Sequence, residues 1–385
     1  MVELALISMV TKRLLLNCSL YLLLSCSADN YFQEAVVEIS IRNPISKSDE
    51  NRFNELIQSI EIIPISEFQP KPLINPYKIF SAFEKLFVLD IYNNLLSVYD
   101  YRGNQLFVIE SDPGPESPAN LRDFFIEEDG SITILSYGEI LKYDAGGKFI
   151  FRKRFTYNSN EIDYVNPTQF SKSGNSYFLW GGTTGIESFR KPVYTLYRLD
   201  SSFQLKDKFL PTKRKLIESY RFQVAGDEVL ISPLLGVDSI YAIKNGVVEP
   251  RFYVNFNKHK IPGGYFEGKN SGDLTYCSGI RNVISSNQHL YLVYNCGNTN
   301  YQAIYSRVSG NIISGRYAVS NYFFPFVIMS THDNKFVAYT KPAWISELIQ
   351  AGLAIPEIAK ELVDIALRSD DQDQVIILML DFKNF

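Results

Sequence analysis

The side chains that could carry out chemistry are few, and their spacing matches none of the common catalytic or metal-binding patterns. The chain of 385 residues has only three histidines, and they are far apart, which leaves too little material for a His-rich metal site. The glycine-rich run 181–185 lacks the Lys-Ser/Thr pair of a phosphate-binding loop. Asp123 and Asp238 have side chains that Ca²⁺ accepts, but no series of ligands accompanies either of them. The sequence therefore predicts no catalytic residue, no resident metal and no cofactor.

One cysteine does lie in the setting of a modification site. The basic pair at 12–13 precedes an apolar run over 14–24, and the tetrapeptide 23–26 reads Leu-Leu-Ser-Cys. Such a segment is typical of a secretory signal, and its apolar core is shorter than the roughly 20 residues that span a bilayer. The tetrapeptide resembles a bacterial lipobox, in which the cysteine is diacylated and becomes the first residue after cleavage. We expect residues 1–25 to be a lipoprotein signal peptide and Cys26 the lipid anchor; a plain signal peptide with an incidental cysteine is the alternative.

Lipid on Cys26 would place the protein at a membrane surface. Each buried CH₂ of an acyl chain contributes about 0.8 kcal/mol, so several chains anchor firmly. Residues 26–57 are mostly polar and lack a clear period, and we interpret them as the lipid-anchored cysteine and a tether with at most a short strand. The predicted location is exported and membrane-anchored, either periplasmic or at the outer membrane.

Composition favours a folded protein rich in strands. The chain is 46% hydrophobic and 14% aromatic, with 25 Tyr and 27 Phe, which suits strands more than helices. Lys and Arg number 38 against 42 Asp and Glu, so the net charge is −4. A nucleic-acid binder normally has a basic excess, and the sequence therefore predicts no nucleic-acid partner.

A repeat of about 44 residues runs through the body of the chain. An apolar strand ends in Tyr or Leu, then Asp, a tight turn and another strand follow; Asp100, Asp144 and Asp200 mark three copies. Two later copies, near 242–248 and 307–313, keep the turn but lose the Asp. A second hairpin precedes each phrase, so every unit holds four short antiparallel strands, as a propeller blade does. The count gives six blades, over about 76–111, 121–155, 166–210, 221–256, 277–318 and 323–382.

The predicted fold is thus all-β, a six-bladed β-propeller of four-stranded antiparallel blades over residues 58–385. The last blade lacks a fourth strand, while an unassigned strand at 59–65 precedes the first blade. Pairing it with 374–382 would close the ring and leave no open edge. A small helical insertion at 343–369 is expected to cap the ring. The alternative fold is a β-sandwich followed by a second β domain.

Two phrases support a resemblance to a known family. Residues 112–116 read Asp-Pro-Gly-Pro-Glu and are similar to a Gly-Pro-Gly-Glu signature between blades one and two, although a glycine before Glu116 is absent. Residues 143–149 match a family phrase Tyr-Asp-x-x-Gly-Lys-Phe. Over 58–385 the chain resembles the six-bladed β-propeller lipoproteins of Bacteroidetes-type bacteria. The resemblance implies the fold and export, and it carries no assigned activity.

All long connections are expected on one rim of the ring, and long loops on a rigid scaffold commonly carry function. The function predicted there is non-enzymatic binding or scaffolding, with a glycan, a peptide or a partner protein as ligand. The alternative is a carboxylate-dependent hydrolase or lyase at the same rim. For Trp180 and Trp344, packing under their own loops remains open, and a solvated rim would also account for the charges. The candidate ligand-binding residues are Glu116, Asp123, Trp180, Arg190 and Trp344.

The last expectation is a disulfide between Cys277 and Cys296. The two flank a predicted hairpin of blade five with a two-residue turn at 286–287, which places them directly opposite each other. Opposed residues of a non-hydrogen-bonded antiparallel pair have Cα atoms about 4.5 Å apart, within disulfide reach. Two free buried thiols are the alternative.

Overall fold

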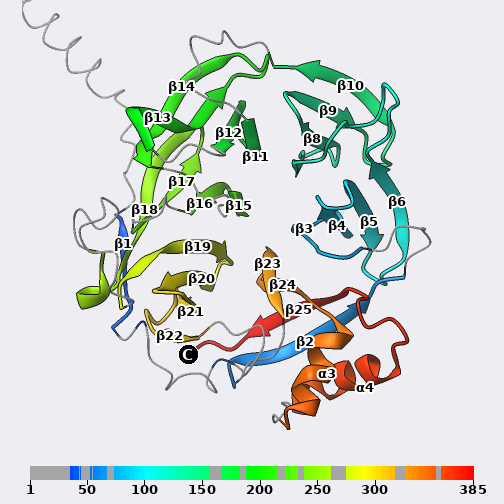
Figure 1. Ribbon diagram of the computed structural model, residues 1–385, viewed down its shortest axis with the longest axis vertical. Helices are drawn as coiled ribbons and strands as arrows, with labels where there is room; N and C mark the ends of the chain where they lie inside the picture. The colour runs from blue at the N-terminus through cyan, green and yellow to red at the C-terminus, as the bar shows by residue number, and fades with distance from the viewer. Residues whose placement is uncertain are drawn as a thin grey trace, which may run out of the picture. The chain divides into compact units, whose positions relative to one another are not determined.

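Six sheets arranged in a ring form the protein in the computed structural model, which confirms the six-bladed β-propeller (Figure 1). Five sheets have four strands, and the sheet of blade four has a fifth. The structure describes residues 35–385 except 43, 45–52, 54, 67–72, 156–165, 183–187, 215–221, 233–237, 262–274, 317–325 and 353–356. The predicted signal peptide and Cys26 lie outside the described residues.

Each blade runs outward from a first strand beside the axis, and the strands follow one another in sequence. Blade one consists of β3 (Lys78–Ala82), β4 (Lys85–Asp90), β5 (Leu95–Asp100) and β6 (Gln105–Glu110). Blade two consists of β7 (Asp123–Ile126), β8 (Ile132–Ser136), β9 (Glu139–Tyr143) and β10 (Phe149–Arg154). Blade three consists of β11 (Asn166–Ser173), β12 (Ser176–Gly182), β13 (Ser188–Leu199) and β14 (Leu205–Arg214).

Blades four and five keep the same order. Blade four consists of β15 (Phe222–Ala225), β16 (Glu228–Ile231), β17 (Ser239–Lys244) and β18 (Val247–Asn255), and the short helix η1 (Asn257–His259) follows it. Blade five consists of β19 (Cys277–Ser285), β20 (His289–Cys296), β21 (Thr299–Ser306) and β22 (Ile312–Arg316).

The repeated aspartates shape the turn between the third and fourth strands. In blades one, two and three, Oδ1 of Asp100, Asp144 and Asp200 accepts hydrogen bonds from the backbone N–H groups two and four residues later, at 2.8–3.0 Å. A side-chain hydrogen bond from Asn104 lowers the pKa of Asp100. The 44-residue period is therefore a repeat of one turn structure, in which an aspartate carboxylate accepts the hydrogen bonds of the backbone N–H groups of the turn.

The ring closes where the sequence predicts. Blade six consists of β23 (Val327–His332), β24 (Lys335–Thr340), β25 (Ile376–Phe382) and, as its outermost strand, β2 (Ile57–Pro64) from the start of the chain. β2 pairs antiparallel with β25 from Ile57–Phe382 to Pro64–Ile376. After β2 the chain reaches blade one, where Ser66 N donates to Gly103 O at 3.0 Å.

An additional strand lies at the edge of blade four. β1 (Val37–Ser40) pairs parallel with β18, within the segment expected to be a tether with at most a short strand. Ile39 and Ile41 are buried in the core between blades four and five. The compact unit of the chain runs from Val37 to Phe385.

The insertion of blade six is helical, as predicted, but it does not cap the ring. Its helices are α3 (Pro342–Gln350), η3 (Glu357–Ala359) and α4 (Lys360–Arg368). Ile345, Leu362 and Ala366 are buried in a cluster with the strands of blade six. Figure 1 shows both α-helices outside the ring beside β2 and not over the axis. The apolar faces of the two α-helices pack against the outer part of blade six, because β2 presents apolar side chains there. Among the described residues, no helix is long and apolar enough to cross a membrane.

Candidate functional site

The long connections gather on one rim of the propeller. In every blade the first strands run the same way along the axis, so the links from second to third strand and from one blade to the next share a rim. We call this the long-connection rim. It carries, among others, residues 111–122, 256–276 and 341–375, while the opposite rim has turns such as 83–84 and 174–175. The element bounds thus confirm the predicted asymmetry.

The connection 111–122 joins blades one and two between two exposed tyrosines. Ser111 N donates to Asn94 O at 3.0 Å, in the turn that also carries Tyr92. At the other end Arg122 N donates to Leu135 O at 2.9 Å, next to the turn with Tyr137, and the Arg122 guanidinium lies over the Tyr137 ring. Tyr92 and Tyr137 are 74% and 67% exposed, so two aromatic rings flank this connection on the long-connection rim.

Two side chains of blade two hold the middle of this connection in place. The Tyr143 hydroxyl donates to Glu116 O at 2.6 Å, and Arg152 donates to Ser117 O. Burial raises the pKa of Tyr143 to about 12, so the phenol keeps its proton and remains a donor at neutral pH. The Asp-Pro-Gly-Pro-Glu segment is therefore a fixed part of the rim, with the Glu116 side chain exposed.

Polar side chains from the first strands line the axis near the long-connection rim. Lys78 Nζ lies 2.7 Å from Asp123 Oδ1 and 2.7 Å from Phe124 O. The other oxygen of Asp123 accepts from Phe170 N at 2.8 Å, and the Asp123 side chain is only 3% exposed. Because Lys78, Asp123 and Phe170 belong to β3, β7 and β11, one carboxylate ties three successive blades together.

A small cavity of about 20 Å³ with both polar and apolar walls lies beside this ion pair. Its walls come from five of the six first strands and include Lys78, Asp123, Gln169, Gln223 and Ser330. The Ser330 hydroxyl is buried and has no hydrogen-bond partner among the described residues. A space of this size holds one or two water molecules or part of a larger ligand.

The structure places the predicted ligand-binding residues in different settings. Glu116 is on the rim and exposed, and Asp123 lines the axis beneath it. Arg190 lies in β13, and its side chain is outside the described residues. Glu116 and Asp123 therefore lie in different parts of the protein, one exposed on the rim and the other buried at the axis.

The two tryptophans were expected in rim insertions, and for Trp180 that expectation is wrong. Trp180 lies within β12, opposite Leu196, and is 3% exposed against Phe222. The strands β12 and β13 extend further than the sequence indicates, so the insertion shrinks to 183–187. Trp344 does lie in an insertion, at the start of α3, where it is half-buried against Tyr339. Trp180 lies near the end of β12, and Trp344 follows the end of β24. Both strands are the second of their blade, and the second strands end on the long-connection rim.

Among the described residues, the exposed aromatic side chains of this rim are Tyr92 and Tyr137, which the sequence analysis missed. Each lies in the turn between the second and third strands of its blade, at residues 91–94 and 137–138. A large aromatic side chain inside a short polar turn has no core to enter. That signal was available in the sequence, whereas the tryptophans drew attention only by their size.

The carboxylates considered for calcium have lysine partners. Asp123 binds Lys78, and Asp238 lies 3.1 Å from Lys260 Nζ. Burial raises the pKa of Asp238, and the neighbouring Lys260 opposes that effect. Within the described parts of the chain no three His, Cys, Asp or Glu side chains form a group that could hold a metal ion.

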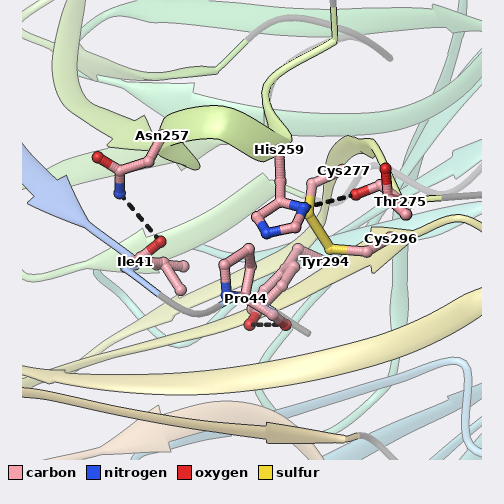
Figure 2. The surroundings of a disulfide bond; sticks show 8 residues. All are labelled: Ile41, Pro44, Asn257, His259, Thr275, Cys277, Tyr294 and Cys296. Atoms are coloured by element: carbon pink, nitrogen blue, oxygen red, sulfur yellow. Dashed lines mark hydrogen bonds between the residues drawn. A yellow bond between two sulfur atoms is a disulfide. The ribbon is translucent and has the colours of Figure 1, made fainter. Parts of the chain in front are cut away.

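Cys277 and Cys296 face each other and are joined by a disulfide in the structure (Figure 2). Their Cα atoms are 3.8 Å apart, closer than the expected 4.5 Å or so. The predicted facing is right, and the turn has the predicted two residues, but it lies at 287–288 and not at 286–287, because Ser286 N donates to His289 O at 2.9 Å. Ser285 pairs with Leu290, and β19 regains the register through two irregularities, at Ser278 and at Arg281. Two β-bulges therefore compensate for the displacement of the turn by one residue.

The disulfide lies beside the N-terminal segment that contains Ile41 and Pro44. Figure 2 shows Ile41 and Pro44 beside the hairpin: Asn257 Nδ2 donates to Ile41 O at 3.2 Å, and the Tyr294 hydroxyl donates to Pro44 O at 3.0 Å. His259 is buried, and its Nδ1 lies 2.9 Å from Thr275 O. This histidine is the one on the long-connection rim, and it is used in packing next to the disulfide.

The comparisons with known proteins agree with the fold. The crystal structure of a protein from Bacteroides fragilis, described as exported, is 15% identical, with a TM-score of 0.71 over 91% of this chain and 100% of that one. A member of the DUF4221 family from Bacteroides vulgatus is 11% identical, with a TM-score of 0.52 over 86% of this chain and 98% of that one. No curated protein matches. A family model described as a domain of unknown function, DUF4934, matches residues 36–381, and the chain therefore belongs to that family.

Proposed function

We propose that the protein is an exported, lipid-anchored propeller that binds a glycan, a peptide or a partner protein on its long-connection rim. One observation carries the binding role: Tyr92 and Tyr137 stand exposed at the two ends of the 111–122 connection. Exposed aromatic rings on a rigid support bind flat apolar faces of sugars or peptide side chains at little entropic cost. The fixed position of the connection, through Tyr143 and Arg152, supports recognition without a large rearrangement.

The proposed export and lipid anchoring are supported by the start of the sequence and by one similar protein. Residues 12–26 combine a basic pair, an apolar core and a lipobox-like cysteine. The similar protein of Bacteroides fragilis is described as exported. A binding surface on an exported scaffold would meet ligands outside the cytoplasm.

Replacing both rim tyrosines with alanine should weaken ligand binding at least tenfold without unfolding the propeller. Each aromatic contact at the centre of an interface contributes about 1–2 kcal/mol or more, so the double variant should bind at least tenfold more weakly. The measurement is binding of purified protein to arrays of polysaccharides and extended peptides, followed by titration of the strongest ligand.

Phe83→Ala is the matched control. Phe83 is 55% exposed in the turn between β3 and β4, on the opposite rim, so this variant also loses an exposed ring. It should bind as the wild type does. Equal loss in the control and in the tyrosine variant, or unchanged binding in the latter, would reject the proposed surface.

Lipidation at Cys26 has its own test. Cys26→Ser should prevent acylation, so that the protein shifts from the membrane to the soluble fraction and no longer incorporates labelled fatty acid. Cys18→Ser changes the other cysteine of the leader and should leave both readouts unchanged. Membrane association that persists in Cys26→Ser would contradict the anchor.

A further inference from the structure

A groove of about 500 Å³ lies between the outer ends of blades four and five. One wall is β1, the strand added at the edge of blade four, and the other comes from β21 and β22 of blade five (Figure 1). Ile41 and Ile312, which pack in or against the core between these blades, supply apolar surface. Tyr305, Asn311 and Ser314 add polar groups. The volume lies in the range of about 300–1,000 Å³ that is common for ligand sites.

The unpaired backbone edge of β1 faces this groove. Ile41 N donates to Asn255 O at 2.9 Å, and Ile41 O accepts from Asn257 Nδ2 at 3.2 Å, so both groups of Ile41 point toward β18 and the residues after it. Along a strand the N–H and C=O groups turn alternately to the two edges, so those of Glu38 and Ser40 point the other way. Both residues line the groove, and no described strand pairs with them on that side. Such an open edge is a template for a further strand.

The side chains of β1 leave this edge accessible. Glu38 Oε1 accepts from Asn255 Nδ2 at 2.9 Å, and Ser40 Oγ accepts from Asn257 Nδ2 at 3.3 Å, so both side chains are held on the side of blade four. Ile39 is buried between the blades. β1 contains no proline and pairs with β18 without a bulge, so two of the usual obstacles to a further strand are missing.

Arg42 places a positive charge at one end of the groove. It lies two residues after the end of β1, lines the groove and is exposed. It makes no hydrogen bond or ion pair with any residue that the structure describes. A guanidinium presents two parallel N–H donors that fit a carboxylate. The end of the groove at Arg42 therefore favours an acidic side chain.

We infer that the groove binds an extended peptide segment of a partner protein, which adds a strand to the free edge of β1. Its backbone would pair with Glu38 and Ser40, and one of its carboxylates would meet Arg42. Main-chain hydrogen bonds supply the affinity in this mode of recognition, and alternate side chains supply the selectivity. The inference goes beyond the proposed function, because this groove belongs to blades four and five, whereas Tyr92 and Tyr137 belong to blades one and two.

The test is fluorescence anisotropy of labelled octapeptides titrated with the full mature chain. The probes alternate valine with threonine, and each threonine in turn is replaced with aspartate or, as the charge control, with lysine. We expect saturable binding of at least one aspartate peptide, at least tenfold tighter than its lysine counterpart. The same aspartate peptide with N-methyl groups on alternate backbone nitrogens cannot donate to the edge of β1 and should bind at least tenfold more weakly.

Ser40→Pro tests the backbone edge itself. Proline removes the N–H that faces the groove and no N–H that bonds to β18, so peptide affinity should fall about three- to tenfold. Ser40→Ala loses the same hydroxyl but keeps the N–H, and it should bind as the wild type does. Hydrogen exchange of segment 37–42 should also slow when the peptide binds the wild type.

Arg42→Glu keeps the result interpretable even if the proline variant folds poorly. Reversing this charge should reverse the preference, so that the lysine peptide binds more tightly than the aspartate peptide. Arg102→Glu makes the same reversal in an exposed turn of blade one and should keep the preference of the wild type. An unchanged preference in Arg42→Glu, an unchanged affinity in Ser40→Pro, undiminished binding of the N-methylated peptide, or no saturable peptide binding would overturn the inference.

The failure of this groove is distinguishable from failure of the rim. If peptide binding is lost in the double variant of Tyr92 and Tyr137 but not in Ser40→Pro, the peptide site is on the long-connection rim, and the groove is wrong. If peptides bind through Ser40 and Arg42 while no array ligand depends on the tyrosines, the groove is right and the rim proposal is wrong. Binding of an oligosaccharide that depends on Arg42, without peptide binding, would make the groove a sugar site and reject the added strand.

Discussion

Asp123→Ala is expected to lower the free energy of unfolding by about 3–5 kcal/mol, the usual effect of removing one partner of a buried ion pair. The carboxylate is 3% exposed and accepts from Lys78 Nζ, Phe124 N and Phe170 N. Its loss leaves the Lys78 ammonium group without a counter-ion and the Phe170 N–H without its acceptor, and it removes a contact that blades one, two and three share. Urea unfolding followed by tyrosine and tryptophan fluorescence measures the change.

Asp227→Ala is the control for this variant. Asp227 lies 3.1 Å from Lys244 Nζ, but its side chain is 76% exposed, so the pair is largely screened by water. The expected loss is at most about 1 kcal/mol. Similar destabilisation by the two substitutions would show that Asp123 does not join the blades.

Gly103→Ala is expected to destabilise the closure of the ring by about 2–4 kcal/mol in total. Gly103 has φ +81°, and a Cβ built on it would lie 2.0 Å from Pro64 O, the backbone at the end of β2. The left-handed backbone alone costs about 1 kcal/mol or somewhat more for alanine, and the clash with backbone adds an overpacking cost of about 1–3 kcal/mol. Thermal unfolding and limited proteolysis after β2 should both report the change.

Gly226→Ala separates the cost of the left-handed backbone from the cost of the clash. Gly226 also has a positive φ, +63°, but a Cβ there meets nothing within 4 Å. This variant should show only the backbone cost. If Gly103→Ala is no worse than Gly226→Ala, the contact between β2 and the turn of blade one is not tight in solution.

The blade count could be predicted because its signal is local. Asp100, Asp144 and Asp200 each organise one turn through bonds to residues two and four positions later. Such a turn needs only its own few residues, so its spacing in the sequence carries over directly to the fold. The pairing of β2 with β25 could be predicted for another reason. Without this pairing both strands would have an open edge, and each strand covers the open edge of the other.

The site was less accessible from the sequence because it depends on where strands end. Trp180 was placed in a loop, but β12 continues to Gly182 and buries the indole. The Cys277–Cys296 facing was predicted from a turn placed one residue too early, and it holds only because two bulges in β19 shift the register back. Strand ends and bulges depend on packing between blades, which no local pattern in this sequence reports.

The position of β1 determines how the protein would respond to force. A tether that ends at Val37 would pull first on β1, which is four residues long and lies at the outer edge of blade four. The load would be opposed by its bonds to β18 and by the burial of Ile39 and Ile41. Only after β1 had detached would tension reach β2, the strand that closes the ring. Under such a load the short strand β1 would detach before the propeller opened.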